Sequence, residues 1–225
     1  MTHSNTLDMT FDKDYFENGL QTGRSMYENY RWIPELTIPL AHEIIQYLGI
    51  KRNQCILDYG CAKGYLVKAF RLLHYTAHGV DISSYAIQEA PADVRKHLTR
   101  IRRDDEDVSY GASVSTLPDY DWIIAKDVLE HIKINNLTPL LKQLSEHTDK
   151  MFVIVPLGIN GNYYAGTNNL DPSHYICEPL SWWEDLFEKH GFDILRSHNN
   201  VDYMKEAYNH IHNAHGFLTL KTKSK

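Results

Sequence analysis

Two carboxylates and two glycines occur at spacings that suit the binding of a polar ligand. Residues 58–64 read Asp-Tyr-Gly-Cys-Ala-Lys-Gly, so that Gly60 and Gly64 follow closely after Asp58. Glycine lets the backbone turn sharply and approach a ligand with no Cβ in the way. Asp81 follows Gly60 at close to the spacing of about 20 residues at which an acidic residue holds ribose hydroxyls in Rossmann-type sites. Asp58 favours a cationic or hydroxyl-bearing group beside it.

The segments around these residues predict a strand, a glycine turn and a helix, in that order. Residues 55–57 are an apolar run typical of a buried strand, and the apolar residues of 65–73 recur at helical spacing. The amide groups at the start of that helix lack partners within the helix and can face a ligand. A second strand ends at Asp81. The third strand is predicted at either 99–103 or 107–110, and further strands at 122–125, 151–155, 191–195 and 216–221. Helices are predicted at 83–90, 137–144 and 182–190. Ser83 and Ser181 are the predicted caps of the first and last of these helices.

Three motifs in the same order resemble a known family. The loop is Gly-x-Ala-x-Gly with an aspartate two residues ahead, not the Gly-x-Gly-x-x-Gly of nicotinamide-binding proteins. It resembles motif I of the class I S-adenosylmethionine-dependent methyltransferases. Residues 79–83 resemble the next motif of that family, and residues 121–131 are similar to its fourth-strand signature. The resemblance spans roughly residues 30 to 220. It implies S-adenosyl-L-methionine as the cofactor and an α/β, Rossmann-like three-layer sandwich. Its sheet has seven mostly parallel strands, the last of them antiparallel.

The same resemblance implies a set of cofactor-binding residues. The glycine loop, Asp58 and the end of the fourth strand would hold the methionine portion, and Asp81 the ribose. The family commonly has a Gly-Asp pair near the adenine amine, where this chain has Gly111 and Ala112, so a backbone group or Ser113 takes that contact instead. For Asp127, the alternative role is the cap of a short helix. The implied set is Asp58, Tyr59, Gly60, Cys61, Gly64, Asp81, Ile82, Ala112, Lys126 and Asp127.

A loop at 157–175, rich in Gly, Asn and Tyr, supplies the candidate catalytic residues. Methyl transfer is an in-line displacement that requires the acceptor atom to be placed behind the methyl group. An oxygen acceptor with a high pKa must also lose a proton, which a neutral histidine removes well near pH 7. His174 is the predicted base and Asp171 would orient it, since similar Asp-Pro-x-His loops occur in small-molecule methyltransferases of this class. The alternative is that His174 only pins the loop. His131 and Asp127 are the next candidates, and His131 has a structural alternative.

Charge and composition limit the classes of molecule that could accept the methyl group. The chain has 23 Lys and Arg against 29 Asp and Glu, a net charge of −6, and the basic and acidic blocks within 94–107 neutralise each other. A nucleic-acid acceptor is therefore disfavoured. Aromatic and Asn-rich segments suit a polar small molecule, such as a sugar or a natural-product intermediate, methylated at oxygen or nitrogen. The alternatives are a non-catalytic methyltransferase-fold binding protein, a tRNA or protein methyltransferase, and a dinucleotide-dependent oxidoreductase. The sequence is also compatible with a homodimer.

A length of 225 residues suits one α/β domain, here 33–225, preceded by an aromatic arm at 1–32. The arm is predicted to act as a lid, with Tyr27 or Tyr30 near the sulfonium, or simply to pack its rings on the domain. The sequence shows neither an apolar run of membrane-spanning length nor a signal peptide, and its three cysteines fit neither a metal nor a disulfide pattern, so we expect a cytoplasmic protein. We expect no metal site, and His210, His212 and His215 to be solvated.

Overall fold

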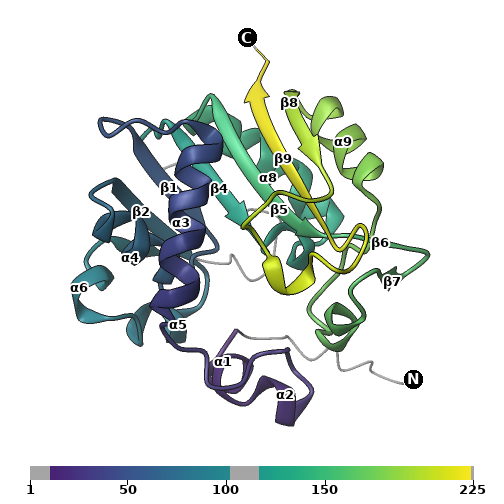
Figure 1. Cartoon of the computed structure of the whole chain (residues 1–225), viewed down its shortest axis with the longest axis horizontal. Helices are drawn as coiled ribbons and strands as arrows, with labels where there is room; N and C mark the ends of the chain where they lie inside the picture. The colour runs from purple at the N-terminus through teal and green to yellow at the C-terminus, as the bar shows by residue number, and fades with distance from the viewer. Residues whose placement is uncertain (1–10, 102–116, 224–225) are drawn as a thin grey trace, which may run out of the picture.

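Seven strands form one central sheet in the computed structural model, which describes residues 11–101 and 117–223 (Figure 1). Their order is β3-β2-β1-β4-β5-β9-β8. Neighbouring strands from β3 to β5 are parallel, whereas β9 runs antiparallel to both β5 and β8. The predicted fold class is therefore confirmed. The strands are β1 (Cys55–Tyr59), β2 (Thr76–Asp81), β3 (Leu98–Arg100), β4 (Trp122–Lys126), β5 (Lys150–Pro156), β8 (Phe192–His198) and β9 (His215–Thr222).

Alternating side chains of the central strands fill two cores, one on each face of the sheet. Ile56 and Ile124 belong to the core beneath α3 and α4, whereas Leu57 and Ile123 belong to the core beneath α8 and α9. All four are fully buried. Successive residues of a strand point to opposite faces, so apolar runs of this kind require helices on both sides. The covering helices are α3 (Pro34–Leu48), α4 (Tyr65–Leu72), α8 (Ile134–His147) and α9 (Leu180–Lys189).

Local end signals explain where several helices begin and end. Helix α3 ends at Gly49, which takes a left-handed φ of 65° and donates its amide to the last turn. The Ser83 side chain accepts from the amide of Ala86 and caps α5 (Ser84–Gln88), as predicted. The predicted cap of α9 is wrong. That helix begins two residues earlier, at Leu180, because Pro179 takes the cap position with a φ of −72° and Ser181 therefore falls within the first turn.

The remaining predicted helices and strands are present in the structure and differ from the predictions mainly in where they begin and end. Strand β3 overlaps the first of its two predicted ranges, while 107–110 lies outside the described residues. The predicted loop at 157–175 contains a small hairpin and a 3₁₀ turn. The short elements are α1 (Lys13–Glu17), α2 (Gly19–Thr22), α6 (Ala92–Arg95), η1 (Leu129–His131), β6 (Gly158–Ile159), β7 (Asn162–Tyr163), η2 (Gly166–Leu170) and η3 (Glu206–Tyr208).

The strand order reverses between β1 and β4, and this fixes where a ligand can bind. From β1 the chain moves outward to β2 and β3, whereas from β4 it moves to β5 on the other side. Such a reversal leaves a crevice at the carboxyl ends of the two strands. Figure 1 shows α1 and α2 lying below this edge of the sheet. None of the helices in the described ranges combines the length and apolar character that crossing a lipid bilayer requires.

Candidate functional site

The glycine loop fits closely between its neighbours after β1. Gly60 and Gly64 take left-handed φ values of 78° and 71°. A Cβ on Gly60 would lie 2.3 Å from the Val128 side chain, and one on Gly64 would lie 2.6 Å from Leu98. Neither position can therefore carry a larger residue without strain at its left-handed φ and without displacing the side chain beside it. The amide of Gly60 also donates to the carbonyl of Val80 at 2.8 Å, which fastens the loop to β2.

Asp81 connects this loop to the end of β2. One carboxylate oxygen accepts from the amide of Ala62 and the other from the amide of Ser83, both at 2.7 Å. Burial raises the pKa of Asp81, while these backbone amides act in the opposite direction. A carboxylate oxygen has more than one acceptor site, so both oxygens can still accept from ligand hydroxyls. The position predicted to hold the ribose is thus rigid and oriented.

Asp58 is the second buried carboxyl of the crevice, with 5% of its surface exposed. Burial raises the pKa of Asp58 to about 7; Lys126 opposes this shift and Asp81 adds to it. A carboxyl with this pKa gains from a cationic neighbour, which would favour its ionised form. Asp58 is therefore electrostatically suited to a positively charged ligand group.

Asp127 lies between two lysines at the end of β4. One of its carboxylate oxygens accepts from Lys126 Nζ at 2.6 Å and also from Lys205 Nζ. The other oxygen is buried without a hydrogen-bond partner within the described residues. Burial alone would raise the pKa of Asp127, but Lys126 and Lys205 together lower it well below its usual value. The turn η1 is capped by Val128, so Asp127 does not act as a helix cap.

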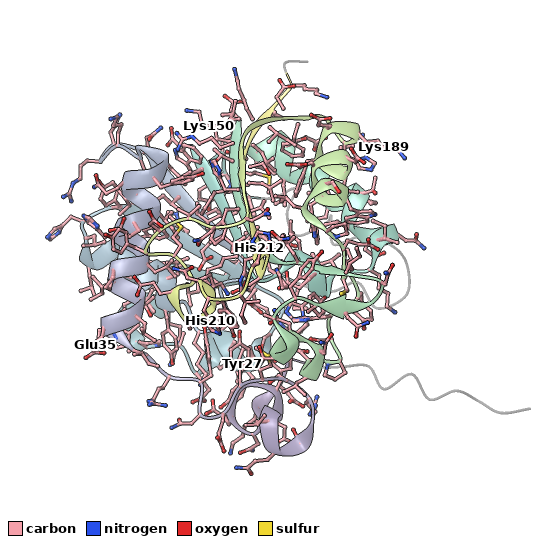
Figure 2. All side chains as sticks on the ribbon, turned by 45° about the vertical axis from the view of Figure 1, so that its right-hand side comes forward. Tyr27, Glu35, Lys150, Lys189, His210 and His212 are labelled. Carbon is pink, nitrogen blue, oxygen red and sulfur yellow. The ribbon has the colours of Figure 1, made fainter. Side chains whose placement is uncertain are left out.

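The crevice forms two cavities that share Gly60, Ala62, Tyr27 and Asp127. The first, of about 630 Å³, is lined by residues of the β2 end, of η1 and of the arm; they include Tyr59, Asp81, Ile82, His131, Phe11, Tyr15 and Phe16. The second, of about 1160 Å³, is lined by Asp58, Cys61, Lys126 and Tyr30 among others. Figure 2 labels Tyr27 where the arm meets the rest of the domain. Nearly all predicted cofactor residues that the structure describes line one cavity or the other, and Gly64 forms the N-terminus of α4 beside them.

The described part of the arm is fastened directly to the glycine loop. Lys63 forms an ion pair with Glu17 and donates to the carbonyl of Tyr30 at 3.0 Å. The hydroxyl of Ser83 donates to the carbonyl of Phe11, and that of Tyr85 donates to Glu17 at 3.0 Å. These contacts hold the aromatic residues of the arm over the crevice.

The loop at 157–175 brings His174 to His131, with ring centroids 4.5 Å apart. The amides of Tyr175 and Ile176 donate to the carbonyl of Glu130 at 2.8 and 3.2 Å, which docks the loop onto η1. Nδ1 of His174 lies 3.1 Å from the carbonyl of Asn168. Because a carbonyl only accepts, Nδ1 carries the proton and Nε2 of His174 keeps a lone pair.

Asp171 lies beside His174 and is linked to His131 through Ser173. The hydroxyl of Ser173 donates to Asp171, so its oxygen accepts from Nδ1 of His131 at 2.7 Å. This fixes the His131 tautomer that leaves Nε2 with its lone pair. The second Asp171 oxygen accepts from the Tyr15 hydroxyl at 2.9 Å and lies 4.0 Å from Nε2 of His174. The spacing of Asp171 and His174 in sequence suggests a direct pair, but Ser173 takes the strong hydrogen bond.

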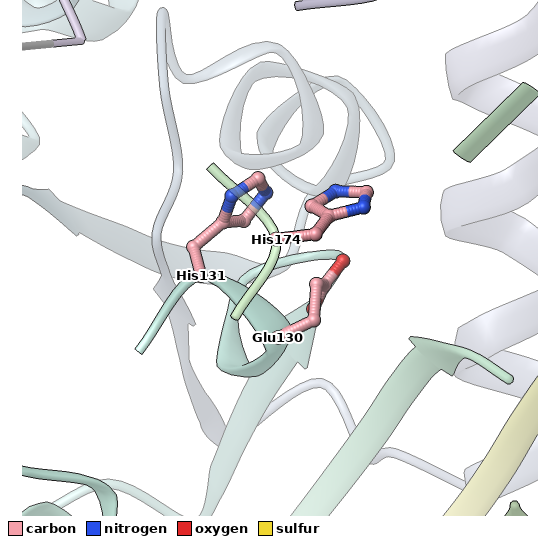
Figure 3. Close-up of side chains that lie close together, drawn as sticks. All are labelled: Glu130, His131 and His174. Carbon is pink, nitrogen blue, oxygen red and sulfur yellow. The ribbon is translucent and has the colours of Figure 1, made fainter. Parts of the chain in front are cut away.

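Burial keeps both histidines neutral at pH 7. Burial lowers the pKa of His131 to about 4, and the neighbouring His174 adds to this decrease. Burial also lowers the pKa of His174. Glu130 is buried beside them, and burial together with Asp127 raises the pKa of Glu130 well above its usual value. Glu130, His131 and His174 each offer a ligand atom, and these atoms lie within 4.8 Å of one another (Figure 3).

Residues 35–197 match the family model described as "Methyltransferase domain". The chain belongs to the methyltransferase domain family. The fold and this match confirm the resemblance to class I S-adenosylmethionine-dependent methyltransferases, and S-adenosylmethionine is the cofactor. A search of curated proteins gave no significant match.

Solved structures with this fold include methyltransferases of several kinds. A TehB-like SAM-dependent methyltransferase from Corynebacterium glutamicum is 14% identical with a TM-score of 0.57, covering 82% of this chain and 88% of that one. The magnesium protoporphyrin IX methyltransferase of Synechocystis with bound SAH is 17% identical with a TM-score of 0.57, covering 94% and 97%. The mitomycin 7-O-methyltransferase MmcR is 16% identical with a TM-score of 0.57, covering 83% and 54%. At these identities the likeness shows the shared fold.

The residues of this methyltransferase-family chain fit the cofactor. Asp81 and Asp58 are both buried at the crevice, one lining each cavity, where a ribose and a cationic methionine group require acidic partners. The left-handed glycine turn brings backbone close to the same space. Ala112 lies outside the described residues.

Three further observations add to or correct the predicted site. Lys205 comes from the connection between β8 and β9, and nothing in the local sequence marks it as a partner of Asp127. Figure 2 shows His210 and His212 on the same connection, both exposed as expected. The prediction for His215 is wrong: it is only 3% exposed, because it begins β9 and packs its ring 4.9 Å from that of Tyr208.

Proposed function

We propose that this methyltransferase transfers the methyl group of S-adenosylmethionine to an oxygen or nitrogen of a polar small molecule, such as a sugar or a natural-product intermediate. The observation that carries the proposal is the first cavity. It joins Asp81 on the cofactor side to Asp127 and His131 on the opposite side, beneath aromatic residues of the arm.

The cofactor residues divide between the two cavities. Asp81 would accept from the ribose hydroxyls, and Asp58 would pair with the ammonium group of the methionine portion. Tyr59, Gly60, Cys61 and Ile82 would form the walls, with Lys126 and Asp127 at the end of β4 and Gly64 at the start of α4. When bound, S-adenosylmethionine supplies an electrophilic methyl group on a sulfonium. The ring of Tyr27, which lines both cavities, would attract that cation.

His174 and His131 are the proposed catalytic residues, and Asp171 positions His131 through Ser173. Each imidazole has its Nδ1 engaged and its Nε2 lone pair available, so either can accept a hydrogen bond or a proton from an acceptor hydroxyl. His131 lines the first cavity, while His174 packs against it from the docked loop.

The arm is proposed to act as a lid. Phe11, Tyr15 and Phe16 close the first cavity, and the Lys63–Glu17 pair fastens them to the glycine loop. Covering the crevice in this way would exclude water and leave space for an acceptor of limited size. Two of the similar structures, the mitomycin 7-O-methyltransferase and the magnesium protoporphyrin IX methyltransferase, are named for small organic acceptors, which supports the same size class.

The first test is calorimetric titration with S-adenosylhomocysteine, followed by transfer of a radiolabelled methyl group to a panel of sugars and hydroxylated or amino-substituted metabolites. We expect the product cofactor to bind the wild type and one acceptor class to be labelled. The His174→Asn variant should lose transfer while keeping its affinity for S-adenosylhomocysteine. A folded wild type that does not bind S-adenosylhomocysteine would exclude the proposed activity. Labelling of RNA or of a protein instead would show that the acceptor is that macromolecule and not a polar small molecule.

A further inference from the structure

We propose that Glu130, His131 and His174 form a binding site for a divalent cation of the zinc class beside the acceptor cavity. Glu130 and His131 come from η1, directly after β4, and His174 comes from the docked loop before α9. One ligand atom from each lies within 4.8 Å of the others, and Figure 3 shows the three side chains gathered around a common space. Two imidazoles and one carboxylate are the protein ligands of many catalytic zinc sites.

The hydrogen bonds behind the two imidazoles prepare them as ligands. Nδ1 of His174 donates to the carbonyl of Asn168, and Nδ1 of His131 donates to Ser173, which in turn donates to Asp171. Histidines that bind metals usually donate their other ring N–H to a carbonyl, a carboxylate or a hydrogen-bonded group of this kind, which fixes the ring and its tautomer. Both Nε2 atoms therefore carry a lone pair in a fixed orientation.

Glu130 provides an independent observation that points to a cation. Its side chain is 1% exposed, and its Oε2 is buried without a hydrogen-bond partner among the described residues. A buried polar atom of this kind is costly unless something pairs with it. The lysines nearby are already held by Asp127, which accepts from both Lys126 and Lys205. A cation held between Glu130 and the two imidazoles would satisfy this oxygen.

Binding requires a modest closure of the three side chains and leaves room for the acceptor. Zinc bonds of about 2.0–2.2 Å place tetrahedral ligands closer together than the observed separation, so small side-chain rotations must accompany binding. His131 also lines the first cavity, so a cation held by its imidazole would lie beside the space proposed for the acceptor.

A cation at this place would deepen the proposed function, on which this part of the inference rests. It would bind the acceptor through an oxygen and lower the pKa of a hydroxyl held there, so that the hydroxyl releases its proton to water and the imidazoles act as ligands instead of the proton acceptors proposed above. Acceptors with two adjacent oxygens, such as vicinal diols and hydroxy-carbonyl compounds, would then be preferred because they can chelate the cation. Cation binding itself does not depend on methyl transfer.

The test is titration of the full-length, chelator-treated protein with Co²⁺, followed by visible absorption and by displacement with Zn²⁺. We expect one Co²⁺ per chain, with the intense visible bands of a low-symmetry site. Glu130→Gln and His174→Asn should each weaken binding more than 100-fold, and Ser173→Ala should weaken it about 10–100-fold, as expected for a residue behind the ligand. His212→Asn, at an exposed histidine outside the cluster, is the matched control and should bind Co²⁺ as the wild type does.

Circular dichroism and titration with S-adenosylhomocysteine on the same variants show whether each one is folded. His174→Asn changes a residue of the docked loop rather than of the sheet edge and serves as the second variant if Glu130→Gln does not fold. The absence of a stoichiometric Co²⁺ signal in the folded wild type would overturn the inference, as would a signal that persists in both ligand variants. A wild type that binds Co²⁺ but not S-adenosylhomocysteine would contradict the proposed function and still support the cation site.

Discussion

Lowering the pH through neutrality should weaken the binding of S-adenosylhomocysteine, because Asp58 must be ionised to pair with the ammonium group of the ligand. Asp58 is 5% exposed, and burial raises the pKa of its carboxyl from 3.8 to about 7. Lys126 limits this rise and Asp81 increases it. In the free protein the carboxyl is therefore largely protonated at pH 6 and largely ionised at pH 8.

The size of the effect follows from this pKa. For a single group that must be ionised, the apparent Kd scales with one plus the ratio of protonated to ionised carboxyl. Between pH 8 and pH 6 this predicts a weakening of about tenfold, or about 1.4 kcal/mol. The same shift has a consequence for stability. Since the folded state binds this proton more tightly, the contribution to stability is full below about pH 3.8 and is lost as the pH rises through about 7.

The assay is calorimetric or fluorescence titration of S-adenosylhomocysteine at several pH values, on the wild type and on Asp58→Asn. The variant should bind more weakly than the wild type at pH 8, and its Kd should stay nearly constant across the range, because asparagine does not ionise. A wild-type Kd that does not change between pH 6 and pH 8 would refute the reasoning. An equally steep change in Asp58→Asn would assign the pH dependence to another group.

Three further substitutions test the cofactor site and the attachment of the arm. Asp81→Asn should weaken S-adenosylhomocysteine binding by about 1–3 kcal/mol in calorimetry, the size of a lost charge-assisted hydrogen bond, and a change below twofold would argue against a ribose contact. Gly60→Ala should lower the unfolding free energy by about 1–3 kcal/mol in urea titration, since its Cβ would lie 2.3 Å from Val128 at a φ of 78°; an unchanged midpoint would contradict this. Lys63→Met keeps the aliphatic stem but removes the ion pair with Glu17, so proteases should cleave the arm faster, and equal cleavage rates would show that the arm is held by other contacts.

The sequence was sufficient for those features that depend on contiguous residues. The glycine turn, Asp58 and Asp81 could be predicted because a strand, a turn and a helix follow one another, and this order fixes where each side chain lies. The Ser83 cap could be predicted for the same reason. The buried strands were recognised from their apolar runs, although their ends differ by a few residues, since burial and pairing rather than local sequence decide where a strand stops.

Residues joined by tertiary contacts could not be predicted in this way. Lys205 pairs with Asp127 across 78 positions, and the segment around it carries no motif. The link from Asp171 to His131 was not foreseen, because the turn at 171–174 places Ser173 between the carboxylate and His131. Glu130 was overlooked because a glutamate beside a histidine becomes informative only once the loop at 157–175 is seen to dock on it.

The fastening of the arm to the glycine loop has a kinetic consequence. The same segment that walls the first cavity also lines the second, so an arm that acts as the proposed lid would have to move before the cofactor could be exchanged. Each catalytic cycle would then include one opening and one closing of this segment, in addition to the chemical step. Lids of this kind commonly move on the microsecond to millisecond scale, and product release rather than chemistry often limits the turnover number. For this protein, substitutions in the arm would then change the turnover number even where they touch neither the cofactor nor the acceptor.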